Sequence, residues 1–257
     1  MIKKPKTLYF DIETSPCTAF VWSTGKQFVQ YNQMGKEWNI ICVSYMWDTD
    51  KKPTSISFDL NKYDLTKFDD DSDKKLLKEF SEIYNSAEVV VAHNGQHFDI
   101  SKIRARLVKY GLPDLDPIIV SDTYIKSKRI GFTSHKLDSI GKFLNLGRKS
   151  HTDFDLWLKV IHKDKKALDY MVKYCEQDVK LLRQVHLALA PYIKPSVNLA
   201  VYNQDNTLCH KCGHNRFRNK GYTYTRLGKY LDLRCTKCFT TQHRGENLLA
   251  NAKSYTR

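Results

Sequence analysis

The acidic side chains with the most informative spacing are Asp11 and Glu13, which end the apolar segment Leu8–Thr14. Side chains alternate between the faces of a β-strand, so these two carboxylates would share one face of a short strand. The opposite face would carry Leu8, Phe10 and Ile12. Two carboxylates one step apart repel each other and resist burial, and a divalent cation would offset that repulsion. The alternative is an ordinary strand end that runs into a polar loop.

Two further acids lie at positions that would bring them to the same place. Asp99 follows a short apolar segment and opens a helical pattern, and Asp178 lies in a long helical pattern near the C-terminus. Tyr174 precedes Asp178 by four positions, so the two side chains project from one helix face. Asp99 and Asp178, together with Asp11 and Glu13, predict a site of four carboxylates that is hard to assemble without metal.

Four of the seven cysteines form two Cys-x-x-Cys pairs, Cys209 with Cys212 and Cys235 with Cys238, separated by residues 213–234. Such a set indicates metal rather than disulfides in a cytosolic chain. Four thiolates predict one tetrahedral Zn²⁺ with no open position, which is the pattern of a structural site. Substitute ligands lie nearby, although four cysteines leave no vacancy: His210, His214 and His243. A segment this small would need the metal for its stability.

Basic and aromatic residues are interleaved between the two cysteine pairs. Cations that bind phosphates and rings that stack on bases are the combination with which proteins bind single strands. The predicted contacts with nucleic acid in this segment are Arg216, Arg218, Lys220, Tyr222, Tyr224, Arg226, Lys229 and Arg234. The alternative is a protein–protein module with a solvated basic face.

Composition agrees with an anionic partner. The 257 residues carry a net charge of +14, and the last 62 contain 11 Lys and Arg against 3 Asp and Glu. Such an excess of positive charge favours nucleic acid. Pro191 and Pro195 follow the last long helical pattern, which predicts a first domain over 1–195 and a second, basic domain over 196–257. No run of about 18 apolar residues occurs, so we expect no membrane span and a cytoplasmic protein.

Hydrophobic periodicity predicts an α/β fold. The strands are expected at 8–13, 40–47, 55–60, 88–92 and 118–120, and the helices at 73–85, 99–110, 134–144 and 165–190. This order predicts a mixed five-stranded sheet flanked by helices, in which three strands form a meander and later strands join through helical crossovers. Val108 and Phe143 are expected to face the core. The acidic run Asp69–Asp73 is expected to be a solvated turn at a helix N-terminus.

The ordered acids resemble the motifs of the DEDD superfamily of 3′→5′ exonucleases, whose fold is ribonuclease H-like. Phe10–Thr14 matches the first motif, Ala92–Asp99 the second and Tyr174–Asp178 the third. Lys173 stands where another subgroup has histidine, so the match is to the tyrosine (DEDDy) subgroup. The segment Ser134–Ile140 is similar to the family's helix between the second and third motifs.

The resemblance covers roughly residues 6 to 190. Within the superfamily, this segment is similar to stand-alone relatives of the proofreading domains of family B DNA polymerases. It implies that Asp11, Glu13, Asp99 and Asp178 hold two Mg²⁺ or Mn²⁺ ions and that Tyr174 orients the attacking water. Two metals can stabilise both the attacking and the leaving oxygen of a phosphodiester. Four thiolates add one structural Zn²⁺ in a module that resembles a zinc ribbon. The remaining predicted contacts with nucleic acid are Thr14 and Asn94.

The function predicted from these features is metal-dependent 3′→5′ exonuclease activity on single-stranded DNA, with release of 5′-mononucleotides. The first alternative is an exoribonuclease that trims RNA, since the sequence does not show how a 2′-hydroxyl is read. The second is a non-catalytic zinc-ribbon protein that binds or recruits nucleic acid. A bacterial or phage-encoded setting suits a compact nuclease of this kind.

Several residues near the motifs have alternative interpretations. Asn94 either supports the substrate or shapes a tight turn with Gly95. His93 and His97 are interpreted as structural or supporting residues, and Cys175 as a packing residue. The aromatic residues of the N-terminal half either stack on unpaired bases or pack in the core: Tyr31, Trp38, Tyr45 and Trp47.

Overall fold

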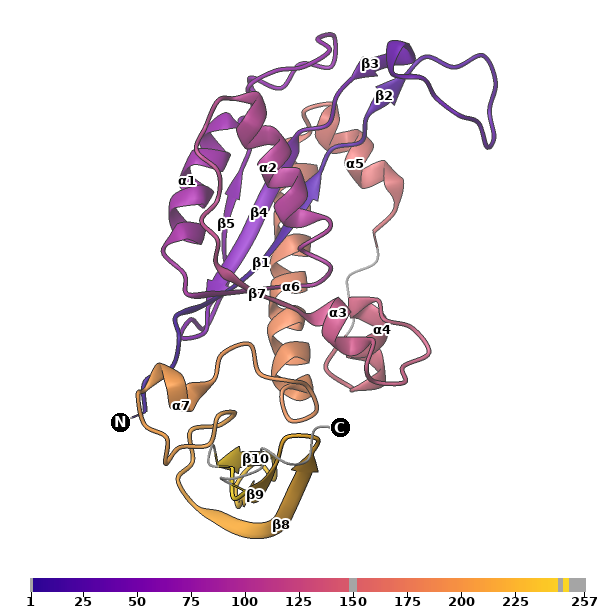
Figure 1. The fold of residues 1–257 in the computed structure, drawn as a ribbon. Coiled ribbons are helices and arrows are strands. Elements are labelled where there is room, and N and C mark those ends of the chain that lie inside the picture. Colours follow the sequence, from indigo (N-terminus) through magenta and orange to yellow (C-terminus); the bar gives the residue numbers. More distant parts are fainter. Residues whose placement is uncertain (1, 148–151, 245–246, 250–257) are drawn as a thin grey trace. The chain divides into compact units, whose positions relative to one another are not determined.

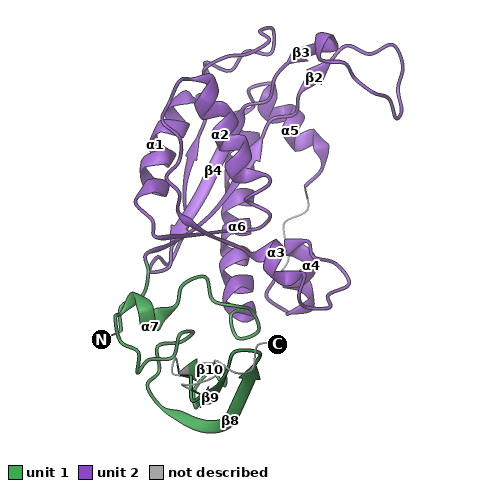
Figure 2. Cartoon of the chain, viewed as in Figure 1, with its two compact units in different colours: residues 1–5, 190–257 green, residues 6–189 purple. Residues whose placement is uncertain are grey.

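The computed structural model describes residues 2–147, 152–244 and 247–249. The chain divides into two compact units, shown in Figure 2. The larger is Lys6–Leu189, and the smaller combines Met1–Pro5 with Ala190–Arg257. The domain boundary predicted at 195/196 therefore falls inside the smaller unit, which also takes in the first five residues. Among the described residues, no helix has the length and apolar character needed to cross a membrane.

The larger unit is built on a five-stranded sheet with the order β5-β4-β1-β6-β7. Its strands are β1 (Thr7–Thr14), β4 (Ile40–Trp47), β5 (Thr54–Ser57), β6 (Val89–Ala92) and β7 (Ile119–Asp122). β1, β4 and β5 pair antiparallel, whereas β6 pairs parallel with β1 and β7 pairs parallel with β6. The predicted mixed sheet, with its meander and later crossovers, is confirmed.

Two helices cover the apolar face of β1. They are α1 (Lys74–Asn85) and α2 (Asp99–Lys109), which lie together on one side of the sheet in Figure 1. The buried cluster on this side contains Leu8, Phe10 and Ile12 from β1, as the alternation predicts. The same cluster takes in side chains from α1 and α2: Leu76, Leu77, Phe80, Ile103 and Leu107.

The other face of the sheet is covered by α6 (Lys165–Leu189), joined by α5 (Phe154–Ile161). A second buried cluster links β4 to these helices through Ile41, Val160, Leu168, Met171 and Cys175. Burying apolar surface is the main favourable term in folding, so this cluster is what holds α6 against the sheet. The face of β1 that carries Asp11 and Glu13 is consequently turned toward α6.

Two predicted core positions are wrong. Val108 on α2 is 79% exposed, and Phe143 at the end of α4 (Leu137–Phe143) is 72% exposed. Both lie in the last turn of their helices. Helical periodicity identifies an apolar stripe but does not show where the element that covers the stripe ends. In the larger unit, the short helices α3 (Thr123–Ser127) and α5 were not predicted.

An insertion separates β1 from β4. It contains the strands β2 (Thr18–Ala19) and β3 (Met34–Lys36), which pair antiparallel, and the 3₁₀ turn η1 (Tyr31–Gln33). The insertion exposes large apolar side chains, including Phe20, Trp22 and Phe28.

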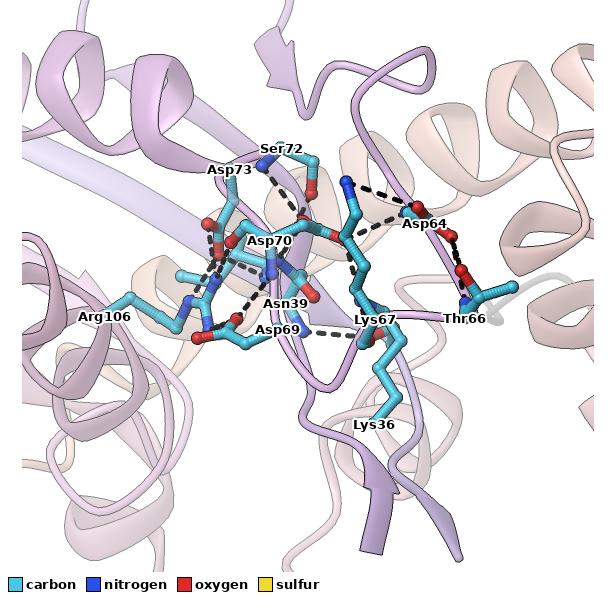
Figure 3. A network of polar contacts seen from close by, with 12 residues as sticks. Lys36, Asn39, Asp64, Thr66, Lys67, Asp69, Asp70, Ser72, Asp73 and Arg106 are labelled. Atoms are coloured by element: carbon cyan, nitrogen blue, oxygen red, sulfur yellow. Dashed lines mark hydrogen bonds and ion pairs between the residues drawn. The ribbon is translucent and has the colours of Figure 1, made fainter.

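The acidic run Asp69–Asp73 is not a solvated turn. Arg106 on α2 is almost fully buried and grips Asp73 with two hydrogen bonds, Nε to Oδ2 and Nη2 to Oδ1, each 2.8 Å long. Its Nη1 also reaches Asp69 at 3.1 Å (Figure 3). Asp73 is fully buried and accepts from the backbone N–H of Ile40 at 2.9 Å. The run therefore ties α2 to the start of β4 through a buried ion network.

Asp70 is the second centre of this network. Its Oδ2 lies 2.7 Å from the buried Nζ of Lys36, and its Oδ1 accepts from Asn39 at 3.0 Å. Burial alone would raise the pKa of Asp70, but the hydrogen bonds from Lys36 and Ser72 lower it to about 2. The insertion between β1 and β4 is thus anchored to the body of the larger unit by charge.

The smaller unit has its own three-stranded antiparallel sheet, β10-β9-β8. Its elements are α7 (Leu199–Tyr202), β8 (Phe217–Thr225), β9 (Gly228–Cys235) and β10 (Thr241–Arg244). The first residues of the chain complete it: the side-chain amide of Asn203 accepts from Lys3 N at 2.8 Å and donates to Lys3 O at 3.0 Å. Ile2 packs so closely on Gly213 that a Cβ there would lie 2.9 Å from its Cγ2.

Candidate metal sites

Three of the four predicted acids come together. Asp11 and Glu13 on β1 and Asp178 on α6 each place a carboxylate oxygen within 4.8 Å of the others. Asp178 is only 1% exposed, whereas Asp11 and Glu13 are partly buried. Three carboxylates at this separation repel one another strongly in a partly buried setting, and a divalent cation with hard oxygen ligands would relieve that repulsion. The donor set therefore fits a metal such as Mg²⁺ or Mn²⁺.

Asp99 is anchored to the same stretch of β1 in a different way. It is the first residue of α2, is 2% exposed, and its Oδ1 accepts from the backbone N–H of Ile12 at 3.1 Å. Ile12 lies between Asp11 and Glu13. Asp99 is not among the three acids that meet within 4.8 Å, so the structure places it beside that group and not within it.

The turn that delivers Asp99 depends on a residue that the sequence did not reveal. Asp122, at the end of β7, accepts from Asn94 N at 3.0 Å and from Gln96 N at 3.3 Å. Asn94 has a positive φ of 65°, a conformation that asparagine tolerates, so its backbone serves the turn. Gly95 is required sterically, because a Cβ there would lie 2.3 Å from that of Ala92. The only sign of this role in the sequence was the position of Asp122, an acid at the end of a predicted strand.

The histidines of the second motif do not join the carboxylates as ligands. His93 uses Nδ1 with Thr123 Oγ1 and Nε2 with the carbonyl of His135, both at 2.9 Å. These contacts fix the ring between β6 and α3, in line with a structural role. His97 is exposed at the surface of the turn.

Tyr174 is held by an aromatic neighbour. The ring of Trp157 on α5 meets that of Tyr174 edge-on, with centroids 6.4 Å apart. The indole Nε1 of Trp157 donates to the carbonyl of Thr14 at 3.1 Å. Trp157 therefore connects the end of β1 with the helix that carries Tyr174. Nothing in the periodicity of 152–164 indicated this role, because it depends on contacts of α5 with α6 and with the end of β1.

Cys175 packs against the carboxylate group without ionising. It is fully buried, and its thiol donates to the carbonyl of Asp11 at 3.4 Å. Burial raises the pKa of Cys175, and the neighbouring Cys42 and Asp11 raise it further. The thiol thus stays neutral, consistent with its interpretation as a packing residue.

The four C-terminal cysteines form a second cluster. Their sulfur atoms all lie within 4.8 Å of one another, and the pairs Cys209–Cys238 and Cys212–Cys235 are each 3.6 Å apart. Four sulfurs at about 2.3 Å from a tetrahedral Zn²⁺ would be separated by about 3.8 Å, so the cluster fits that ion. The distance is much longer than a disulfide bond of about 2 Å.

The nearby histidines are engaged elsewhere. His210 Nδ1 contacts Gln242 at 2.9 Å, and His214 Nε2 contacts Thr236 at 3.1 Å. His243 Nδ1 lies 2.6 Å from Asp232. The cluster is therefore a four-cysteine set.

The predicted nucleic-acid contacts of the smaller unit are spread over its hairpin. Tyr222 and Tyr224 are exposed on one face of β8, and Lys229 Nζ lies 4.1 Å and 5.6 Å from their ring centroids. Arg218 pairs across the sheet with Arg234. Three other predicted contacts are exposed: Arg216 before β8, Lys220 at the β8 bulge and Arg226 in the hairpin turn.

The aromatic residues of the N-terminal half divide into two groups. Trp38, Tyr45 and Trp47 pack against the main core, which supports the core interpretation. Tyr31 is 68% exposed. The most exposed ring in this half, Trp22, lies in the insertion and was not predicted as a contact.

The mixed five-stranded sheet, with acids of β1 facing an acid of α6, defines a ribonuclease H-like domain. The chain belongs to the RNase H superfamily, because the model of that superfamily matches residues 61–190, just over half of the chain. The matched segment starts after β1 and includes Asp99 and Asp178.

Two polymerases show similarity to parts of the chain. DNA polymerase III PolC-type of Ureaplasma parvum serovar 3 is 43% identical over 72 residues, which are 27% of this chain and 5% of that protein. The family B DNA polymerase of Pyrobaculum calidifontis superposes with a TM-score of 0.52 at 14% identity, covering 74% of this chain and 25% of that one. The chain thus spans a small part of each polymerase, and the second likeness concerns the fold alone.

Proposed function

We propose that the protein is a metal-dependent 3′→5′ exonuclease that hydrolyses single-stranded DNA and releases 5′-mononucleotides. The observation that carries the proposal is the meeting of Asp11, Glu13 and Asp178 within 4.8 Å, with Asp99 anchored to Ile12 between the first two. Membership of the RNase H superfamily and partial similarity to two DNA polymerases support it.

In this proposal Asp11, Glu13, Asp99 and Asp178 hold two Mg²⁺ or Mn²⁺ ions. Bound ions of this kind supply charge stabilisation to the attacking and leaving oxygens of a phosphodiester. Tyr174 lies one helical turn before Asp178, so its hydroxyl is assigned to orient the attacking water. A phenol is a poor base near neutral pH, so its contribution is orientation and not proton removal. This assignment places the protein in the tyrosine subgroup of DEDD nucleases.

The smaller unit is assigned to substrate binding. One Zn²⁺ held by Cys209, Cys212, Cys235 and Cys238 would stabilise its sheet, as metal does in other small cysteine-rich modules. The exposed cations and rings of the hairpin would then bind phosphates and unpaired bases. Thr14 and Asn94 are assigned to the substrate end that enters the carboxylate site.

The test is nucleotide release from matched DNA and RNA strands labelled at either end, with Mg²⁺ or Mn²⁺ added. We expect immediate release of labelled mononucleotide from 3′-labelled DNA and a ladder of single steps from 5′-labelled DNA. Asp178→Asn should lower the rate roughly 100-fold or more, because it removes one anionic ligand. Asp169→Asn is the matched control, since Asp169 is an exposed acid of the same helix.

Three results would contradict the proposal. The first is absence of mononucleotide release by the unmodified protein. The second is an equal loss of rate in the two aspartate variants. The third is preferential degradation of RNA, which would favour the exoribonuclease. Calorimetric titration with Mn²⁺ adds a readout independent of turnover, and Asp178→Asn should weaken Mn²⁺ binding whereas Asp169→Asn should not.

A further inference from the structure

The two cysteine pairs fold into equivalent turns. The residue after the second cysteine donates its N–H to the carbonyl of the first: Gly213 to Cys209 at 2.9 Å, and Phe239 to Cys235 at 3.1 Å. The N–H of each first cysteine then donates to the carbonyl two residues past the second cysteine, at 2.7 Å and 3.0 Å. Gly213 and Phe239 therefore occupy the same position in two copies of one turn.

That position demands a left-handed backbone. Gly213 has a φ of 73° and Phe239 a φ of 58°. Glycine adopts this conformation freely, whereas a residue with a bulky side chain is disfavoured there. Gly213 is buried against Ile2, but Phe239 leaves 57% of its surface exposed. The second turn thus holds an aromatic ring in an unfavourable conformation without the benefit of full burial.

Positive charge is concentrated beside this ring. The guanidinium of Arg234 lies 5.7 Å from the centroid of Phe239, and its Nε donates to the carbonyl of Phe239 at 3.2 Å. Arg218 on β8 stands directly opposite Arg234 on β9. Like charges directly opposite each other in a sheet are destabilising. Lys237, within the turn itself, is also exposed.

The acids described in this unit form their hydrogen bonds with residues other than Arg218 and Arg234. Asp205 accepts from Thr207, and Asp232 is bonded to Thr223 and to His243. The bulge between Asn219 and Gly221 shifts the alternation along β8. Arg218, opposite Arg234, therefore lies on one face of the hairpin, whereas Tyr222 and Tyr224, opposite Leu231 and Lys229, lie on the other. The ring and its cations therefore form a spot separate from the tyrosine pair.

We propose that Phe239, Arg218 and Arg234 form a subsite for single-stranded nucleic acid. The ring stacks on an unpaired base, and the two guanidinium groups bind the neighbouring phosphate. The negative charge of the phosphate offsets the repulsion between the two guanidinium groups. Base stacking on an aromatic ring tolerates any base, so the subsite grips a strand without reading its sequence. This inference rests on the proposed function and deepens it by naming the site that retains the strand.

The experiment measures binding and folding in the same full-length proteins. Asp11→Asn with Glu13→Gln serves as the parent, so that the strand stays intact, and a labelled 20-nucleotide oligothymidylate is followed by fluorescence anisotropy. Phe239→Gly should weaken binding roughly tenfold, since one stacked base is lost. It should leave zinc content unchanged and keep or raise the melting temperature, because it relieves the left-handed residue. Tyr192→Ala, which removes a 79% exposed ring of the same unit, should change neither.

The charges are tested in the same assay. Arg218→Gln with Arg234→Gln should weaken binding and reduce the salt slope of the binding constant by about 1, as expected for one lost phosphate contact. Lys194→Gln removes an exposed cation of the same unit outside the spot and should have a smaller effect.

Two outcomes would overturn the subsite: parental affinity in Phe239→Gly, or a fall in melting temperature and zinc content that accounts for its loss of affinity. Phe239→Asn, which also suits a positive φ, checks the second case because it removes the ring without adding glycine flexibility. Failure of the nuclease proposal is seen separately. In that case, proteins that keep Asp11 and Glu13 would release no mononucleotide from a five-nucleotide strand, with either phenylalanine or glycine at residue 239.

Discussion

Acidification is expected to loosen the larger unit through His186. Its Nδ1 lies 3.0 Å from the hydroxyl of Tyr9 on β1, and its Nε2 lies 3.3 Å from Ser121 Oγ on β7. Burial lowers the pKa of His186 to about 4, and the positive charge of Lys126 contributes to the shift. The unfolded chain has a histidine pKa near 6.5, so unfolding takes up a proton between these two values.

The magnitude follows from that difference. A pKa depressed by about 2.5 units corresponds to about 3 kcal/mol of stability, because each unit is worth about 1.4 kcal/mol. This stability is fully present above about pH 6.5 and is lost as pH falls toward 4. By linkage, about 2 kcal/mol is gone at pH 5. His186 lies two helical turns after Asp178, and Tyr9 lies two residues before Asp11. The loss therefore weakens the packing of α6 on β1 that brings the carboxylates together.

The assay is urea unfolding followed by tryptophan fluorescence, since all four tryptophans lie in the larger unit. His186→Gln should flatten the dependence of unfolding free energy on pH between 6.5 and 4 by about 3 kcal/mol relative to the unmodified protein. His162→Gln, which alters an exposed histidine of the same unit, should leave the curve unchanged. Parallel curves for His186→Gln and the unmodified protein would refute the reasoning. Lys126→Met should raise the pKa of His186 and reduce the loss.

Three other perturbations have expected outcomes. Trp157→Phe should lower the free energy of unfolding by about 1 kcal/mol, because it loses the hydrogen bond to Thr14 O. It should also reduce kcat more than it raises KM. Trp22→Phe, at a fully exposed ring, is the control and should change neither stability nor kinetics. Asp70, whose pKa is lowered to about 2, should contribute about 2 kcal/mol of stability that is present above about pH 4 and lost toward pH 2, so Asp70→Asn should flatten urea-unfolding measurements in that window. Chelation of zinc, or Cys212→Ala, should abolish dispersed NMR signals of the three-stranded sheet while the tryptophan emission of the larger unit stays native; emission that changes in step would contradict separate stabilisation.

The sequence predicted what depends on local periodicity. The alternation in β1 placed Asp11 and Glu13 on one face and the apolar residues on the other. The succession of strands and helices predicted a mixed five-stranded sheet with a meander and later crossovers. The spacing of Tyr174 and Asp178 was visible for the same reason. These features need only the geometry of a single strand or helix.

What depends on distant partners was not visible. The run Asp69–Asp73 was expected to be solvated, because Arg106 and Lys36 lie more than 30 residues away along the chain. The roles of Trp157 and Asp122 likewise arise only when separate elements meet. Local composition identifies charges, but burial and pairing decide their role, and these are properties of the assembled sheet.

The attachment of residues 2–5 to the smaller unit has a consequence for synthesis and proteolysis. The Lys3–Asn203 bonds join positions 200 residues apart, and the larger unit lies entirely between them in sequence. During translation, Ile2 and Lys3 can contact Gly213 and Asn203 only after the whole larger unit has been synthesised, so the smaller unit folds after the larger one. A single cut between residues 189 and 190 would also leave the smaller unit attached. Residues 2–5 belong to that unit, contact Asn203 and Gly213, and remain covalently joined to the larger unit between residues 5 and 6.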